Sequence, residues 1–221
     1  MFTNKKMYAI IGAYIFLFET NCVFTCTLKR KALMKIHYNA PVILTYAFIC
    51  VVVLLLGSIT NQTLINQFFV IYRTPPTDPF LYIRLFTYIF GHANFDHFFG
   101  NLTMLLLVGP MVEEKYGSKP LLLMMGFTTF IGGLIHIAFF TTGALGASGI
   151  VFMLILLTPF TNMKRGRLPL TFILVAVVFI GREIMYAVTV DDSISRMGHV
   201  AGGVSGAVMG MFINKQRIGR R

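Results

Sequence analysis

Charged residues are scarce in this sequence. Asp, Glu, Lys and Arg make up 12% of its 221 residues, whereas a soluble domain carries about 25%. Apolar residues reach 56% and the mean hydropathy is +0.75. The few charges stand in short clusters between long apolar runs, which is how loops and membrane spans alternate. This pattern excludes an ordinary soluble domain and predicts an all-α, polytopic membrane protein that forms one helical bundle.

Cysteine is rare as well. The three cysteines, Cys22, Cys26 and Cys50, lie in apolar stretches. They have no metal-type spacing and do not suggest a disulfide framework. We interpret them as small apolar residues within the membrane, so the sequence predicts neither a cysteine metal centre nor a disulfide scaffold.

The net charge of +11 would suit a nucleic-acid partner, but the positions of the cations favour another explanation. One alternate set of inter-span segments carries thirteen cations: Lys29, Arg30, Lys31, Lys35, Lys115, Lys119, Lys164, Arg165, Arg167, Lys215, Arg217, Arg220 and Arg221. The other set carries only Arg73, Arg84 and Arg196. By the positive-inside rule the first set is cytoplasmic. We therefore expect a multi-pass protein of the cell membrane, in contact with the bilayer and not with nucleic acid.

The apolar runs predict six strong spans. They are Pro41–Ile59, Phe98–Val112 (in a helix that begins near Asn94), Leu121–Phe140, Ser148–Phe160, Leu168–Val188 and His199–Ile213. The fourth has only 13 residues, roughly 20 Å of helix, and the hydrocarbon core is ~30 Å thick. The start of this helix, at Ser148, should therefore lie below the outer surface, inside the protein.

Two further segments have a different character. Met7–Leu28 is a weak span because Glu19 and Asn21 stand near its middle. We expect residues 1–33 to be an accessory hydrophobic segment, with a possible extra span, or an upstream extension; residues 34–221 would form the six-helix domain. Thr60–Gly91 is aromatic and broken by prolines, which favours short helices lying in the external membrane interface.

Polar groups inside a membrane are costly, so each is a functional candidate. The first is Ser148, in Gly146-Ala147-Ser148-Gly149 at the start of the short helix. Its glycines permit a sharp turn and a close approach by another chain. The unpaired N–H groups of the helix start suit a developing oxyanion. Taken alone, however, the tetrapeptide is more typical of an ordinary N-cap serine.

The second candidate is His199, which opens a glycine-rich helix. Glycines recur every four residues at Gly198, Gly202, Gly206 and Gly210, a stripe suited to close helix packing. His199 shares a face with Gly202 and Gly206. If the helix that packs on this stripe begins at Ser148, the imidazole can accept the serine proton. The alternative is a packing motif with an incidental histidine.

The third candidate is the group His92, His97 and Asn101. His97 and Asn101 are four residues apart and face the same way on a helix. Both can donate hydrogen bonds to an oxyanion, while His92 can fix the preceding loop. A metal site is the rival interpretation, weakened because there is no HExxH motif and no carboxylate at a helical ligand spacing. His37 and His136 lack such company, and we interpret them as structural or interfacial.

Together these motifs resemble the rhomboid intramembrane serine proteases. The resemblance covers roughly Tyr82 to Gly210. It consists of His92-x4-His97-x3-Asn101, Gly146-x-Ser148-Gly149 and His199-x2-Gly202-x3-Gly206, in the family's order.

The resemblance implies a rhomboid-like bundle in which Ser148 is the nucleophile and His199 the general base. His97 and Asn101 would be oxyanion donors. Supporting roles would fall to His92, Gly146, Gly149, Phe152 and Gly202, with Phe152 at an aromatic position that packs on the histidine. Arg84 matches the family's external-loop arginine, and Glu113 or Glu114 with Gly117 the acidic end of its second helix. Ile83 and Gly198 depart from the usual tryptophan and alanine, which puts local packing in doubt but removes no reacting group.

The predicted function is intramembrane serine endopeptidase, acting on transmembrane segments of membrane proteins, with no cofactor or metal. The sequence sets no oligomeric state. One alternative is a catalytically inactive relative that binds membrane clients, although such relatives typically lose the serine or histidine. Another is a small transporter or channel, because intramembrane polar residues also line pathways.

Overall fold

The described part of the chain is almost entirely helical. The computed structural model describes residues 38–162, 170–189, 200 and 202–212, all within the unit Tyr38–Arg221. Its labelled elements are α2 (Pro41–Ile59), α3 (Thr63–Phe68), α4 (Pro79–Thr87), η1 (Tyr88–Phe90), α5 (Phe95–Tyr116), α6 (Ser118–Phe139), α7 (Ser148–Leu157), η2 (Thr158–Asn162) and α8 (Leu170–Thr189). A last helix follows at Gly202–Phe212. The all-α prediction is confirmed, while the expected segment 1–33 lies outside the described residues.

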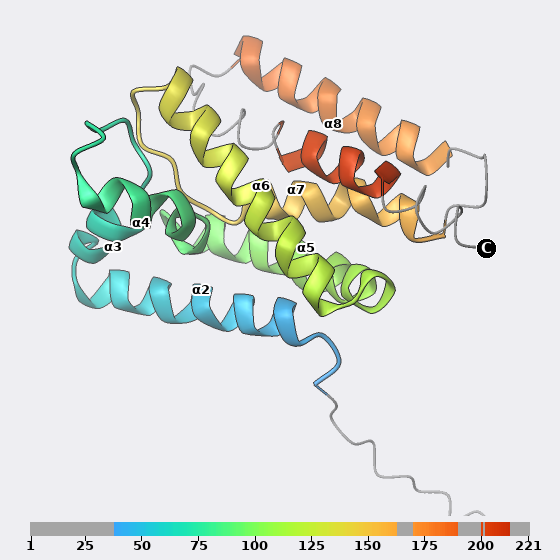
Figure 1. Ribbon diagram of the computed structural model, residues 1–221, viewed down its shortest axis with the longest axis horizontal. Helices are drawn as coiled ribbons and strands as arrows, with labels where there is room; N and C mark the ends of the chain where they lie inside the picture. The colour runs from blue at the N-terminus through green and yellow to red at the C-terminus, as the bar shows by residue number, and fades with distance from the viewer. Residues whose placement is uncertain (1–37, 163–169, 190–199, 201, 213–221) are drawn as a thin grey trace, which may run out of the picture. The chain divides into compact units, whose positions relative to one another are not determined.

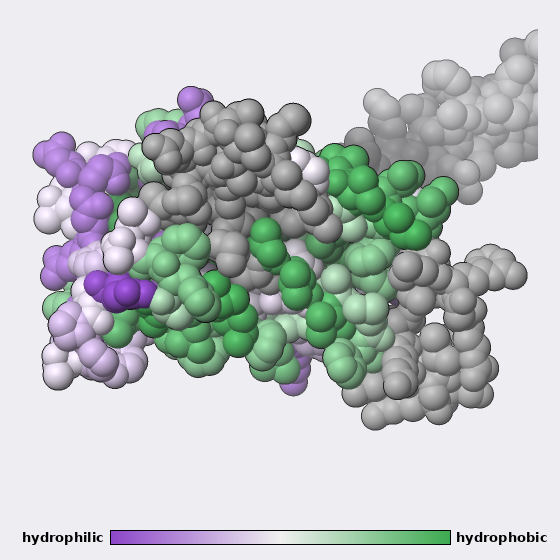
Figure 2. All heavy atoms as spheres, turned by 90° about the horizontal axis from the view of Figure 1, so that it is seen from above, coloured by the Kyte–Doolittle hydropathy of each residue, from purple (hydrophilic) through white to green (hydrophobic). Residues whose placement is uncertain are grey.

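Three described helices, α2, α5 and α6, are long and apolar enough to cross a membrane. Their outward faces carry large exposed apolar side chains, such as Phe48, Leu107 and Leu123. Figure 2 shows hydrophobic residues over much of one face and hydrophilic residues mostly at the end where α3 and α4 lie in Figure 1. These features indicate an integral membrane protein. The count of six crossings remains a prediction.

Helix α7 occupies the centre of the bundle. Most of its side chains are buried, Ile150, Met153, Leu154 and Leu157 almost completely. It contacts α5, α6 and α8, and the last helix runs beside it (Figure 1). With η2 it ends at Asn162, so the prediction of a short fourth helix is confirmed.

The start of α2 is stabilised by a carboxylate from another helix. Pro41 occupies the first turn, as expected, and no side chain of α2 itself caps the helix. The two oxygens of Glu113 accept the backbone N–H groups of Val42 and Ile43, each at 3.0 Å. A negative charge at a helix N-terminus is favourable because unpaired N–H groups meet there. Glu113 thus joins the end of α5 to the beginning of α2.

The connection between α2 and α5 contains short helices, as predicted. Within it, Arg84 of α4 is only 3% exposed. Its guanidinium donates hydrogen bonds to Tyr72 and Thr74, pairs with Asp78, and lies 4.2 Å from the centre of the Tyr72 ring. One arginine therefore ties the preceding loop to α4.

Candidate functional site

Ser148 is the first residue of α7, and its surroundings differ from those of a capping serine. The N-cap residue is Ala147, and no side chain makes a cap hydrogen bond at this helix start. The interpretation of Ser148 as an ordinary N-cap is therefore wrong. Ser148 as a residue is partly exposed, and its side chain does not cap the helix. Among the described residues no side chain caps the backbone N–H groups at the start of α7, which leaves them available to an anion.

Backbone hydrogen bonds hold the segment before Ser148. Ala144 forms an antiparallel bridge with Ile71, with N–H to O distances of 2.9 and 2.8 Å. The N–H of Gly146 donates to the carbonyl of Tyr88 at 2.9 Å. Tyr88 is itself fixed, because its hydroxyl donates to the carbonyl of Thr129 at 3.0 Å. The chain segment before Ser148 is thus bonded directly to the α2–α5 connection and, through Tyr88, to α6.

Gly146 brings this segment against the predicted oxyanion donors. It adopts φ +129°, a conformation that favours glycine. A Cβ added there would lie 2.7 Å from Cε1 and 2.8 Å from Nε2 of His97, and 3.9 Å from Nδ2 of Asn101. His97 and Asn101 therefore share one helix face, as predicted, and that face lies beside the residue two positions before Ser148.

The amide of Asn101 has a donor atom with no acceptor in the part of the chain that the structure describes. Asn101 is buried, and its Nδ2 has no hydrogen-bond partner among the described residues. A buried donor left without an acceptor costs about 1–3 kcal/mol. Such a cost is expected where a donor is held in place to stabilise a negative charge that forms only in the transition state.

His92 lies beneath His97, in the short connection between η1 and α5. It is 1% exposed, and its Nδ1 donates to the carbonyl of Phe90 at 3.2 Å. Its ring meets that of His97 edge-on, with centroids 5.2 Å apart. Burial, and secondarily the charge of His97, lower the pKa of His92 to about 4 against the effect of the Phe90 bond. The ring is therefore neutral at pH 7, and its bond to Phe90 lies within the preceding loop; the supporting role of His92 stays a prediction.

The glycine stripe of the last helix packs on α7. A Cβ at Gly202 would overlap the backbone of Gly149, 2.9 Å from its Cα, and one at Gly206 would lie 2.9 Å from Cα of Met153. Gly210 instead meets side chains, with its added Cβ 2.6 Å from Cδ2 of Phe160 and 3.1 Å from Cδ1 of Leu157. Since Gly202 and Gly206 each meet the backbone of a residue 53 positions earlier in the chain, the two helices run parallel. The helix that packs on the stripe is the one that begins at Ser148.

Two predicted site residues, His199 and Phe152, are not among those that the structure brings together. His199 lies outside the described residues. Phe152 is buried on α7 in an apolar cluster with Leu156 and with Phe172 and Val175 of α8. Its expected packing on His199 stays a prediction.

No group of three or more His, Cys, Asp or Glu residues in the described ranges is placed to hold a metal ion. His136, which we interpreted as structural or interfacial, lies on α6. Its Nε2 forms a hydrogen bond to the carbonyl of Thr142 at 2.7 Å, just beyond the end of that helix.

The sequence did not predict which backbone groups bond to Ala144 and Gly146, in the segment before Ser148. Ile71 and Tyr88 position the segment before Ser148 through main-chain atoms, which any residue type supplies. Only the presence of Gly146, a residue that tolerates φ above zero, gave a hint of this arrangement in the sequence.

A comparison with protein families finds one match. The model of the Rhomboid domain matches residues 79–216, more than half of the chain and a range that includes every predicted site residue. No curated protein matches the chain.

Proposed function

Because the chain belongs to the Rhomboid family, we propose that it is an intramembrane serine endopeptidase with Ser148 as nucleophile and His199 as general base. Its substrates are membrane proteins, cut within or beside a transmembrane segment. The observation that carries the proposal is the packing of Gly202 on Gly149. It joins the helix that begins at Ser148 to the helix Gly202–Phe212, whose first described residue stands three positions after His199 in the sequence.

The register of the two helices supports the position of the base. Extending the offset of 53 from the pair Gly202 and Gly149 back to His199 reaches Gly146, beside His97 and Asn101. Helical residues three apart share a face, so we propose that the helix continues back to His199 and carries it on the face of Gly202. In this proposal the imidazole stands over the start of α7, within reach of the Ser148 hydroxyl.

The chemistry follows from this arrangement. Ser148 Oγ attacks the substrate carbonyl while His199 accepts its proton. The resulting oxyanion receives hydrogen bonds from Asn101 Nδ2, from His97 and from the free N–H groups at the start of α7. His199 then protonates the leaving amine as the C–N bond breaks, which leaves an acyl-enzyme. Water then adds to the acyl carbonyl and loses a proton to His199. His199 returns this proton to Ser148 Oγ as the ester C–O bond breaks, which releases the carboxyl terminus of the product and restores Ser148.

Serine reactivity tests the proposal. We expect a fluorophosphonate probe to label the purified chain and to lose its target in S148A and H199A. The same variants should no longer cut a model transmembrane substrate. S58A is the matched control, because Ser58 bonds only within its own helix, to the carbonyl of Leu54, and should keep full labelling and cutting.

Two results would reject the dyad. If S148A or H199A cut the substrate at the unsubstituted rate, the assigned residues are not the reacting groups. If the unsubstituted chain neither labels nor cuts but retains transmembrane clients in a pull-down, the non-catalytic alternative holds. Solute flux into liposomes that survives S148A would instead indicate a transporter.

A further inference from the structure

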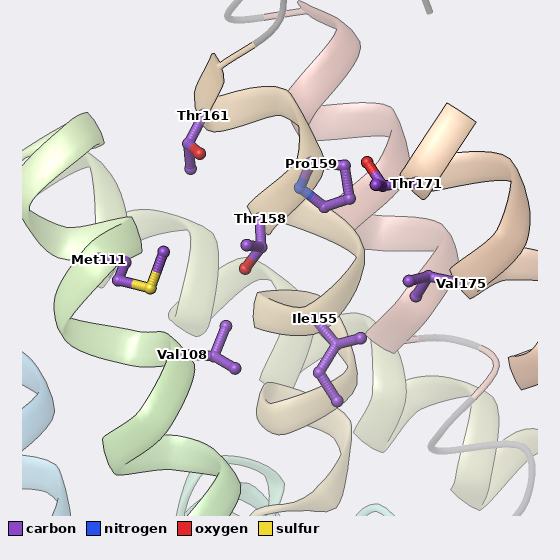
Figure 3. Close-up of a pocket in the computed structure, with 8 residues that line it drawn as sticks. All are labelled: Val108, Met111, Ile155, Thr158, Pro159, Thr161, Thr171 and Val175. Atoms are coloured by element: carbon purple, nitrogen blue, oxygen red, sulfur yellow. The ribbon is translucent and has the colours of Figure 1, made fainter. Parts of the chain in front are cut away.

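An open-sided pocket of about 440 Å³ lies at the end of the bundle opposite Ser148 along α7. Figure 3 shows the side chains that line it. They include Val108 and Met111 of α5, Ile155 of α7, Thr158 of η2, and Thr171 and Val175 of α8. The pocket thus opens where the last turns of α5 and α7 meet the first turn of α8.

The lining is mostly apolar. Five of its eight residues have apolar side chains: Val108, Met111, Ile155, Pro159 and Val175. Of its three threonines, Thr158 already donates its hydroxyl to the carbonyl of Leu154 at 2.8 Å within its own helix. A ligand that suits this surface is apolar.

The size of the pocket decides between a peptide helix and a hydrocarbon chain. A helix about 10 Å across with a 5.4 Å pitch fills roughly 420 Å³ per turn. The pocket, at about 440 Å³, corresponds to about one such turn, so it encloses little of a transmembrane helix. An acyl chain is narrow enough to lie along the pocket.

The pocket also stands at the basic end of the bundle. Lys115 is exposed and lies one turn beyond Met111 on the face of α5 that carries Val108. In the sequence, Lys164, Arg165 and Arg167 fall between the lining residues Thr161 and Thr171. No Asp or Glu occurs from residue 115 to residue 182. By the positive-inside rule this end meets the cytoplasmic leaflet, whose anionic lipids attract such clusters.

From these observations we infer that the pocket between α5, η2 and α8 is a binding site for an anionic phospholipid of the cytoplasmic leaflet. One acyl chain occupies the pocket, and the phosphate headgroup lies at the level of Lys115. The site is separate from Ser148, and its occupancy does not depend on whether the protein is a protease.

The absence of tryptophan from the chain permits a clean test. The substitution T171W places one fluorophore at the exposed rim of the pocket, and L123W places one on the lipid-facing surface of α6, near the same end. Both full-length variants are reconstituted in vesicles of phosphatidylcholine with 10% brominated phosphatidylglycerol or 10% brominated phosphatidylcholine. We expect T171W to be quenched at least threefold more strongly by the anionic lipid, and L123W to be quenched equally by both.

Adding K115Q to T171W should lower the preference for phosphatidylglycerol about fivefold, the weight of one cation at an anionic surface. Native mass spectrometry of the unsubstituted chain is the second measurement, and should find phosphatidylglycerol retained in preference to phosphatidylcholine. Equal quenching of T171W by the two lipids, together with no retained phosphatidylglycerol, overturns the inference. So does quenching of T171W that ignores lipid charge but falls when a transmembrane substrate peptide is added, because the pocket would then receive substrate.

Discussion

Gly202 of the last helix lies directly on the backbone of Gly149, the residue that follows Ser148. This contact has no room for a side chain, since a Cβ at Gly202 would overlap the carbonyl of Gly149. Close backbone approach of this kind is how small residues join membrane helices, where no hydrophobic driving force acts between them. The close spacing between α7 and the last helix at this point therefore requires that residue 202 have no side chain.

Replacing that hydrogen should separate the helices. For G202A we expect the free energy of unfolding to fall by about 1–3 kcal/mol, the usual cost of overpacking, and substrate cutting to fall at least tenfold. Denaturation in mixed micelles followed by circular dichroism measures the first effect, and a cleavage assay the second.

The matched control is G126A. A Cβ at Gly126 of α6 meets nothing within 4 Å. The free energy of unfolding of this variant should therefore equal that of the unsubstituted chain or exceed it by up to about 1 kcal/mol, because alanine favours a helix more than glycine does. If G202A and G126A behave alike in both assays, the Gly202 contact does not position the two helices.

Asn101 should matter for rate and not for stability. Its Nδ2 has no partner among the described residues, so N101A removes no hydrogen bond that the described residues supply to this atom. If the amide receives the oxyanion, kcat should fall about 10²–10³-fold, with KM and the unfolding midpoint close to those of the unsubstituted chain. N66A, on the exposed side of α3, should leave all three values unchanged. An unfolding midpoint that falls in N101A without loss of kcat would make Asn101 a structural residue.

The sequence predicted the helices well because membrane spans need long apolar runs. The short helix at Ser148, the short helices after α2 and the helix start at Asn94 were all foreseen. The last follows from local chemistry, since the Asn94 side chain accepts the N–H of His97 at 2.8 Å. The shared face of His97 and Asn101 was equally accessible, because it needs only the helical repeat.

What escaped prediction depends on residues far apart in the chain. The pairing of Ile71 with Ala144 uses backbone atoms and leaves no periodic trace in the sequence. The family resemblance left Glu113 and Glu114 as equal candidates at the end of α5. Only the fold distinguishes them, because Glu113 is buried against α2 and Glu114 is exposed.

That difference gives a stability prediction. Glu113 accepts two N–H groups of α2 and the hydroxyl of Ser118, the last at 2.7 Å. E113A leaves these donors without their acceptor and removes the charge from the helix N-terminus. We expect a loss of about 2–4 kcal/mol in the free energy of unfolding. E114A, one position along, should change it by less than about 0.5 kcal/mol, and comparable losses in the two variants would contradict the assigned cap.

His92 should make stability depend on pH. Its pKa in the folded chain is about 4, against an ordinary value near 6.5. Between pH 4 and 6.5 His92 is protonated in the unfolded chain but stays neutral in the folded chain. The free energy of unfolding is therefore unaffected by His92 above pH 6.5, and it decreases as the pH falls from 6.5 towards 4. The slope is at most about 1.4 kcal/mol per pH unit, one proton's worth. H92Q keeps an amide donor for the Phe90 carbonyl but has no such proton, so its unfolding midpoint should fall less steeply with acid. Midpoints measured at half-unit steps from pH 4 to 8 give the comparison, and parallel curves for the two chains would show that His92 does not titrate as a buried group.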